Sequence, residues 1–166
     1  MDRATEFQPE SVIRLLGRHG IRYVLIGGLA AVTYGAPLVT QDVDICYARD
    51  PGDLERLAIA LREIHAELRG TPAGLPFHLD ARTLRAGDSF TLTTDVGWVD
   101  IIATPMGTNG YDDLARTAEA FDLFGHRVLV ASVDDLIRMK RAAGRPKDLL
   151  AVEALGALRE ELDRRD

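Results

Sequence analysis

Residues 22–46 constrain the fold of this chain more than any other stretch. They predict an apolar strand, the glycine pair Gly27 and Gly28, a short helix and a second strand. Glycine between a strand and a helix lets backbone N–H groups approach an anion, and the positive end of the helix dipole favours a phosphate there. The stretch therefore predicts a strand–turn–helix unit in which Gly27 and Gly28 cradle phosphate.

The second strand of this unit carries two acids, Asp42 and Asp44, on either side of Val43. Successive side chains of a strand point to opposite faces, so both carboxylates lie on one face and Val43 lies on the other. Two like charges at this distance repel unless a cation sits between them. The spacing predicts a site for a hard divalent ion such as Mg²⁺.

A third acid, Asp100, stands between Val99 and Ile101 in another apolar strand. Aspartate is depleted from strand interiors and is rarely fully buried without a partner. The alternative to a metal site is three aspartates that happen to lie at exposed strand edges. No histidine and cysteine spacing typical of a zinc site accompanies them, and no Ser/His/Asp order suggests a nucleophilic serine.

In this order, the glycine pair, the acid pair and the later third acid resemble the nucleotidyltransferase superfamily of the DNA polymerase β type. Thirteen residues separate Gly28 from Asp42. The chain looks most similar to the small bacterial branch that includes AbiEii-type toxin nucleotidyltransferases and minimal nucleotidyltransferases. The segment RMKRAAGRPKDLLAVEAL near the C-terminus adds to the likeness, which spans residues 22–155.

The resemblance implies a fold and a reaction. The fold would be α/β (α+β): a small twisted mixed sheet flanked by helices, in one domain over residues 1–166. The reaction would move a nucleoside monophosphate from an NTP to an acceptor and release pyrophosphate. Asp42 and Asp44 would bind the Mg²⁺ or Mn²⁺ that accompanies the triphosphate, and with Asp100 they would bind a second ion. Asp100 would also accept a proton from the acceptor.

The resemblance also implies a basic residue near the triphosphate. Residues 138–147 contain five basic side chains, of which Lys140 and Lys147 are the candidates. The alternative is a solvated helix face. Asp148 would either position Lys147 or simply supply a favourable charge at a helix start. The superfamily that the chain resembles frequently has serine where Gly28 stands. The resemblance therefore implies that this chain lacks one hydroxyl contact to phosphate and that its backbone amides must do more.

Periodicity and turn signals outline the rest of the chain. They predict a helix over 9–19, a helix from Asp50 whose apolar stripe reaches Leu68, and a strand within 76–83. The later elements are strands over 89–94, 97–103 and 127–133, a loop and short helix over 104–118, and two final helices. Asn109 and Tyr111 are candidates for substrate contact in that loop, with a plain surface loop as the alternative.

Length and composition limit the class of protein. The chain has 166 residues, enough for one core, and 46% hydrophobic residues, which excludes a largely disordered chain. Its single cysteine, Cys46, follows Asp44 and Ile45 on the apolar strand and is expected to be a buried structural residue. The first residues lack the pattern of a signal peptide and no long apolar run occurs, so we expect a cytoplasmic protein without membrane contact.

Three functions compete at this stage. The first is an enzyme that modifies RNA or a protein, as a housekeeping activity or as a toxin with an antitoxin partner. The second is transfer to a small molecule such as an antibiotic, and the third is a non-catalytic module that binds nucleotide or a partner. The net charge of −6 argues against strong non-specific binding to nucleic acid, although a local basic patch can act within an acidic protein.

Overall fold

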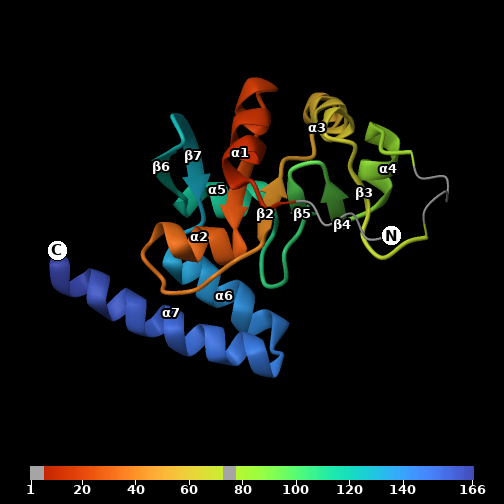
Figure 1. The fold of residues 1–166 in the computed structure, drawn as a ribbon. Helices are drawn as coiled ribbons and strands as arrows, with labels where there is room; N and C mark the ends of the chain where they lie inside the picture. Colours follow the sequence, from red (N-terminus) through yellow and green to blue (C-terminus); the bar gives the residue numbers. More distant parts are fainter. Residues whose placement is uncertain (1–5, 73–77) are drawn as a thin grey trace.

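The computed structural model describes residues 6–72 and 78–166, which form one sheet with helices on both sides (Figure 1). The helices are α1 (Pro9–Arg18), α2 (Gly27–Thr33), α3 (Pro51–Glu63), α4 (Ala81–Ala86), α5 (Tyr111–Thr117), α6 (Val133–Ala143) and α7 (Pro146–Arg165). The strands are β1 (Tyr23–Ile26), β2 (Asp42–Tyr47), β3 (Glu67–Leu68), β4 (Ser89–Thr94), β5 (Gly97–Ile102), β6 (Glu119–Leu123) and β7 (His126–Val130).

Within the described residues, the sheet has seven strands in the order β3-β4-β5-β2-β1-β7-β6. Strand β2 is parallel to β5 and antiparallel to β1, and β1 is parallel to β7. Strand β4 pairs antiparallel with β5, and β6 pairs antiparallel with β7. The predicted α/β class with a mixed sheet flanked by helices is therefore confirmed.

The two faces of the central strands differ in polarity. Val43 and Ile45 of β2 and Val99 and Ile101 of β5 are at most 1% exposed and belong to the hydrophobic core. Their neighbours along the chain project from the opposite face, because side chains alternate along a strand. Figure 1 shows α1 and α3 on one side of the sheet and α2, α6 and α7 on the other. The predicted acids thus project from the face opposite to this apolar row.

Two predictions about the middle of the chain are wrong. The helix that begins at Pro51 ends at Glu63, because His65 adopts a left-handed backbone conformation with φ 52°, and Leu68 enters the edge strand β3. Within the predicted strand over 76–83, residues 76 and 77 lie outside the described part. Asp80 instead caps α4, where its carboxylate accepts a hydrogen bond of 2.8 Å from the backbone N–H of Thr83.

Two other predictions agree with the structure. Cys46 is fully buried and its Sγ donates to the carbonyl oxygen of Ala103 at 3.5 Å, and burial raises the pKa of its thiol to about 12. Ser132 caps α6 by accepting a hydrogen bond from the backbone N–H of Asp135 at 3.0 Å. None of the helices in the described ranges combines the length and apolar character required to cross a bilayer.

Candidate active site

Three carboxylates from two neighbouring strands meet on the polar face of the sheet. Asp42 and Asp44 come from β2, and Asp100 comes from β5, where the parallel register places it directly beside Asp44. One carboxylate oxygen from each residue lies within 4.8 Å of the other two, and all three side chains are partly buried. Carboxylate oxygens are the ligands that Mg²⁺ and Mn²⁺ prefer, so this donor set fits such an ion.

The acids repel one another in the metal-free protein. Burial raises the pKa of Asp44 to about 7, and the negative charges of Asp100 and Asp42 add to this effect. Burial, followed by the charge of Asp100, also raises the pKa of Asp42. A bound cation would reverse this balance by favouring the ionised carboxylates. The protein therefore holds more negative charge at this point than its own side chains neutralise.

The glycine pair lies against the same acids. Gly27 follows β1, has φ +72°, and begins α2 with its Cα turned toward the side chain of Asp44. Gly28 faces Thr40 instead, and a Cβ atom at position 28 would lie 2.9 Å from the Thr40 hydroxyl oxygen. The start of α2 thus approaches the carboxylate cluster without any intervening side chain from Gly27.

A basic residue that sequence reasoning missed contacts the third acid. The Arg69 guanidinium donates to Oδ1 of Asp100 at 2.8 Å and to the carbonyl oxygen of Leu92 at 2.9 Å. The same guanidinium stacks on the indole ring of Trp98, 4.3 Å from its centre. Arg69 follows the two-residue edge strand β3, which no sequence pattern had predicted. Only the pairing of β3 with β4 and of β4 with β5 brings it to the acids.

Of the two predicted lysines, Lys140 is near the cluster. Its positive charge acts on Asp44, where it opposes the rise in the pKa of that carboxyl. Its ammonium also pairs with Oδ1 of Asp148 at 3.5 Å. Asp148 is 1% exposed, and it caps α7 by accepting hydrogen bonds from the backbone N–H and the side chain of Arg145. The Arg145 side chain therefore holds the pKa of Asp148 down at about 2.

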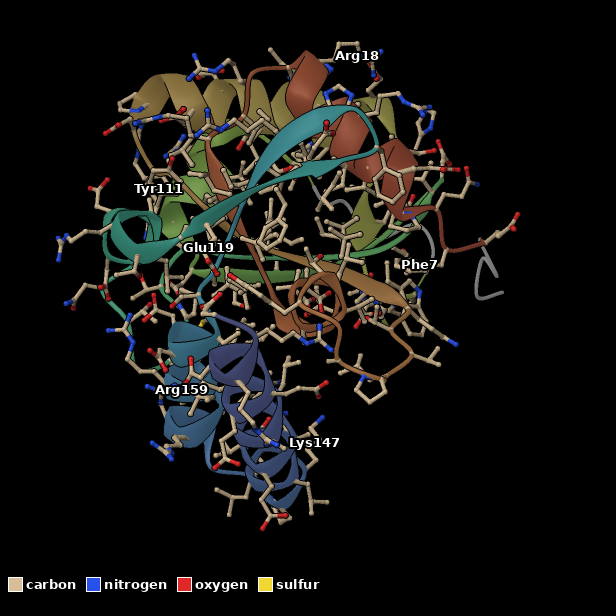
Figure 2. All side chains as sticks on the ribbon, turned by 90° about the vertical axis from the view of Figure 1, so that its left-hand side faces the viewer. Phe7, Arg18, Tyr111, Glu119, Lys147 and Arg159 are labelled. Carbon is tan, nitrogen blue, oxygen red and sulfur yellow. The ribbon has the colours of Figure 1, made fainter. Side chains whose placement is uncertain are left out.

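Lys147 has a different environment. Its side chain is exposed near the start of α7, and no ion pair joins it to another described residue. Figure 2 shows it on the helix pair that projects from the body of the protein. The suggested contact between Asp148 and Lys147 is replaced by the pairs that Asp148 forms with Lys140 and Arg145.

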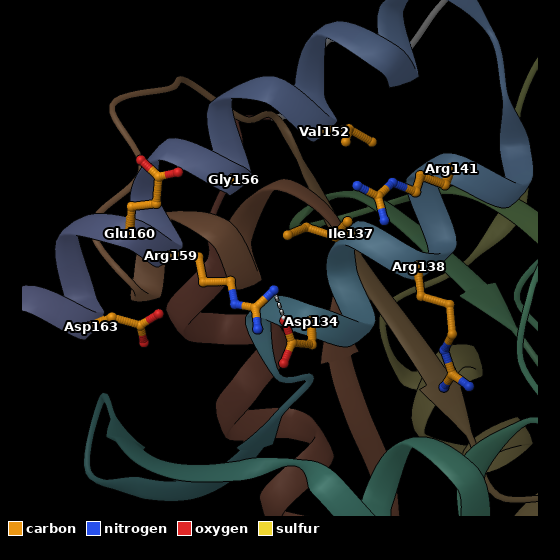
Figure 3. Close-up of a pocket in the computed structure, with 9 residues that line it drawn as sticks. All are labelled: Asp134, Ile137, Arg138, Arg141, Val152, Gly156, Arg159, Glu160 and Asp163. Atoms are coloured by element: carbon orange, nitrogen blue, oxygen red, sulfur yellow. Dashed lines mark ion pairs between the residues drawn. The ribbon is translucent and has the colours of Figure 1, made fainter.

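A large open groove lies elsewhere, between α6 and α7 (Figure 3). It has a volume of about 580 Å³, and none of the three aspartates of the cluster lines it. Its walls carry both signs of charge, including the 3.0 Å pair between Arg159 and Asp134. Mixed charges that pair across the groove are typical of a solvated contact between two helices. We therefore place the candidate site at the carboxylates and not at this groove.

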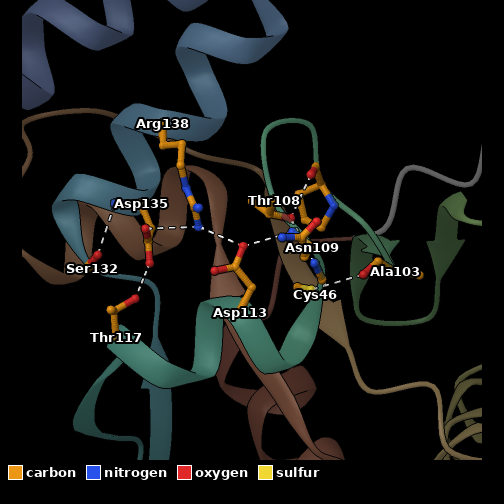
Figure 4. Close-up of polar contacts among 11 residues, drawn as sticks. Cys46, Ala103, Thr108, Asn109, Asp113, Thr117, Ser132, Asp135 and Arg138 are labelled. Atoms are coloured by element: carbon orange, nitrogen blue, oxygen red, sulfur yellow. Dashed lines mark hydrogen bonds and ion pairs between the residues drawn. The ribbon is translucent and has the colours of Figure 1, made fainter.

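Most of the basic cluster over 138–147 is neutralised by acids of the chain. Arg138 donates to Asp113 on α5 at 3.1 Å and pairs with Asp135 at 3.2 Å (Figure 4). Lys140 and Arg145 both pair with Asp148. These contacts join α6 to α5 and to α7, so three of the five basic residues have structural partners. The cluster is not an unpaired patch for a polyanion.

Asn109 and Tyr111, the two loop candidates, are not directed at the acids by any described contact. Asn109 is exposed, and its backbone N–H donates to Asp113 at 2.9 Å (Figure 4). The Tyr111 ring lies 5.6 Å from the guanidinium of Arg22, which precedes β1. The glycine pair follows the other end of that strand. Tyr111 is the first residue of α5 and packs partly against the hydrophobic core.

The fold is found in solved structures. The chain superposes on the lincosamide antibiotic adenylyltransferase LnuA, solved with lincomycin bound, with a TM-score of 0.60 and 14% sequence identity. The match covers 93% of this chain and 99% of LnuA. The chain also superposes on TM1012, a proposed nucleotidyltransferase of Thermotoga maritima, with a TM-score of 0.51 and 17% sequence identity. This match covers 99% of each chain.

No protein-family model matches this sequence, and no curated protein matches it. At identities of 14% and 17%, the structural likeness establishes the fold and does not by itself transfer an activity. The chain therefore has the fold of nucleotidyltransferases, with three carboxylates gathered at one point of its sheet.

Proposed function

We propose that this protein is a metal-dependent nucleotidyltransferase, which moves a nucleoside monophosphate from an NTP to an acceptor hydroxyl and releases pyrophosphate. The observation that carries the proposal is the convergence of Asp42, Asp44 and Asp100 within 4.8 Å beside Gly27. The shared fold with LnuA and TM1012 supports it. The resemblance of the glycine pair and acids to the polymerase β-type superfamily supports it independently.

The three acids would hold Mg²⁺ or Mn²⁺, since their oxygens fit a hard cation and their own charges are incompletely balanced. When bound, such ions offset charge on the phosphates and lower the pKa of an attacking hydroxyl. Asp44 is central to this role, because burial and both neighbouring acids act on its carboxyl.

In the proposed reaction, the acceptor oxygen forms a bond to the α phosphorus of the NTP. The bond between that phosphorus and the oxygen bridging to the β phosphate breaks, and the electron pair leaves with pyrophosphate. Asp100 accepts the proton of the acceptor hydroxyl. Arg69 already donates to Oδ1 of Asp100, so Oδ2 is the oxygen that remains to bind an ion and, through its second lone pair, to accept the proton.

The phosphates of the donor would lie over the start of α2. Gly27 presents no side chain there, so backbone N–H groups of the turn can bind phosphate oxygens. Lys140 would offset charge on the leaving pyrophosphate, because it already acts electrostatically on Asp44. Lys147 remains a candidate from the resemblance alone.

For the acceptor, the observations favour a small molecule over RNA. RNA affinity rests on basic side chains that neutralise phosphates, whereas Arg138, Lys140 and Arg145 already have acidic partners in this chain. The net charge of −6 suits a neutral or cationic acceptor. LnuA, which has the same fold, is a lincosamide antibiotic adenylyltransferase, and a lincosamide antibiotic is a small molecule.

Two other functions remain open to direct test. A toxin that modifies RNA or protein, as in the AbiEii-type branch, predicts growth arrest on expression and relief by an antitoxin partner. A non-catalytic module predicts that nucleotide or partner binding survives replacement of Asp42, Asp44 and Asp100 by asparagine.

The decisive experiment incubates the purified chain with each α-labelled NTP, Mg²⁺, and either pooled small hydroxyl compounds, total RNA or cell protein. We expect label in a small molecule, dependent on Mg²⁺ and lost in the Asp42→Asn and Asp44→Asn variants. Label in RNA or protein would replace the acceptor assignment. The absence of labelled product with every acceptor, together with unchanged nucleotide binding in those variants, would contradict the enzymatic proposal.

A further inference from the structure

Arg69 contacts the carboxylate cluster directly, through Asp100. Its guanidinium bonds Asp100 at 2.8 Å and the Leu92 carbonyl oxygen at 2.9 Å, and it stacks on Trp98 at 4.3 Å. Its backbone N–H donates to Thr91 at 2.9 Å, which anchors residue 69 to strand β4. The side chain is thus held from three directions and is only 23% exposed.

The geometry sets Arg69 on a single carboxylate. It bonds Oδ1 of Asp100, and no hydrogen bond joins it to Asp42 or Asp44 among the described contacts. Trp98 and Asp100 are two residues apart on β5, so ring and carboxylate share one face, and the planar guanidinium spans both. The Nε atom of Arg69 is buried without a hydrogen-bond partner, a cost that the other contacts must outweigh.

We propose that Arg69 is a positioning residue for the metal centre: it clamps one oxygen of Asp100, so that this acid offers its other oxygen toward Asp44. This inference rests on the proposed function. Arg69 also places a fixed positive charge beside three carboxylates, which limits their mutual repulsion when no ion is bound. It therefore opposes ion binding slightly while it holds the third acid in a productive orientation.

The charge of Arg69 and its hold on Asp100 affect the metal centre with opposite signs. Arg69→Met removes both, and its comparison with Arg69→Lys separates them. Methionine preserves length and apolar packing on Trp98 but removes the charge and the forked donor. We expect Mn²⁺ without nucleotide, measured by electron paramagnetic resonance, to bind at least about threefold more tightly, because a nearby positive charge is gone. We expect kcat to fall at least about tenfold, because Asp100 is no longer held in place.

Arg69→Lys keeps the charge but loses the planar fork. We expect its Mn²⁺ affinity to equal that of the wild type and its kcat to lie between those of the wild type and Arg69→Met. Trp98 is the only tryptophan of the chain, so its fluorescence reports the loss of stacking in both variants. Arg18→Met is the matched control, because Arg18 pairs with Glu63 on the exposed surface of α1 and α3.

Three results would overturn the proposal. One is unchanged Mn²⁺ affinity and kcat in Arg69→Met. Another is a raised KM for NTP with unchanged metal affinity and kcat, which would make Arg69 a substrate-binding residue. The third applies if Arg69→Met does not fold: an Arg69→Lys variant whose kcat equals that of the wild type would then overturn the proposal. Wild-type protein that binds no Mn²⁺ and transfers no nucleotide would instead remove the proposed function, on which the inference depends.

Discussion

Gly27 and Asp44 are so close that only glycine fits at position 27. A Cβ atom there would lie 2.1 Å from Oδ2 and 2.8 Å from Cγ of Asp44, and the φ of +72° disfavours any side chain. The glycine that opens the turn and the acid at the centre of the cluster thus form one packed unit. The requirement for glycine comes from contact with the carboxylate as well as from the backbone turn.

Gly27→Ala should therefore damage stability and activity together. We expect a loss of about 2–3 kcal/mol in the free energy of unfolding, from backbone strain and displacement of Asp44. Gly156→Ala is the control, since nothing lies within 4 Å of a Cβ there and the residue is inside α7. It should gain about 0.5–1 kcal/mol. Urea titration of both variants checks this, and equal effects would contradict the packing account.

Asp44→Asn should move stability and activity in opposite directions. Removing one charge from the crowded cluster leaves metal-free stability unchanged or raised by roughly 1 kcal/mol. Turnover should drop at least about a hundredfold, because metal binding and stabilisation of the transferring group both weaken. Thermal melts without metal and transfer assays with Mg²⁺ test the pair. A variant that melts several degrees lower yet keeps full transferase activity would make Asp44 structural.

The stability of the metal-free protein should also depend on pH through Asp44. Its pKa is about 7 in the folded chain against an ordinary 3.8, so between these values the folded state binds the extra proton. This contribution to stability is complete below pH 3.8, declines as pH rises and is lost above about pH 7, where the folded carboxyl is ionised as well. The difference in melting temperature between wild type and Asp44→Asn should therefore be smallest near pH 4 and should favour the variant increasingly up to pH 8. Saturating Mg²⁺ should reduce this difference in melting temperature at pH 8. A difference that does not change with pH would refute the raised pKa of Asp44.

Lys140 and Lys147 should respond differently to removal of charge. Lys140→Met should lower kcat/KM for the NTP at least about tenfold, because its charge acts at the cluster. Lys147→Met should change kcat/KM less than about twofold, because that side chain is exposed and has no described ion pair. Steady-state kinetics on both variants, with melts to confirm folding, decide between them. Equal losses would place Lys147 at the triphosphate as well.

The sequence predicted the parts of the site that are local in the chain. The alternation of Asp42, Val43 and Asp44 follows from covalent geometry, so it holds in any sheet that contains the strand. The strand, glycine pair and helix are likewise encoded in one continuous stretch, residues 23–33. Predictions of helix and strand bounds from the local sequence were wrong at two places, where a helix cap or a left-handed backbone conformation set the boundary. Asp80 caps a helix within a segment that was predicted as a strand, and His65 ends α3 before Leu68.

Only the tertiary structure decided which distant residues join the acids. The register of β2 against β5 sets Asp100 beside Asp44, and a shift by one residue would turn Asp100 into the core. The pairing of the two-residue edge strand β3 with β4 places Arg69 beside the acids. The turn between α6 and α7 places Lys140 within ion-pair distance of Asp148. Such contacts depend on hydrogen bonding and packing between segments far apart in the chain, and a local pattern carries no record of them.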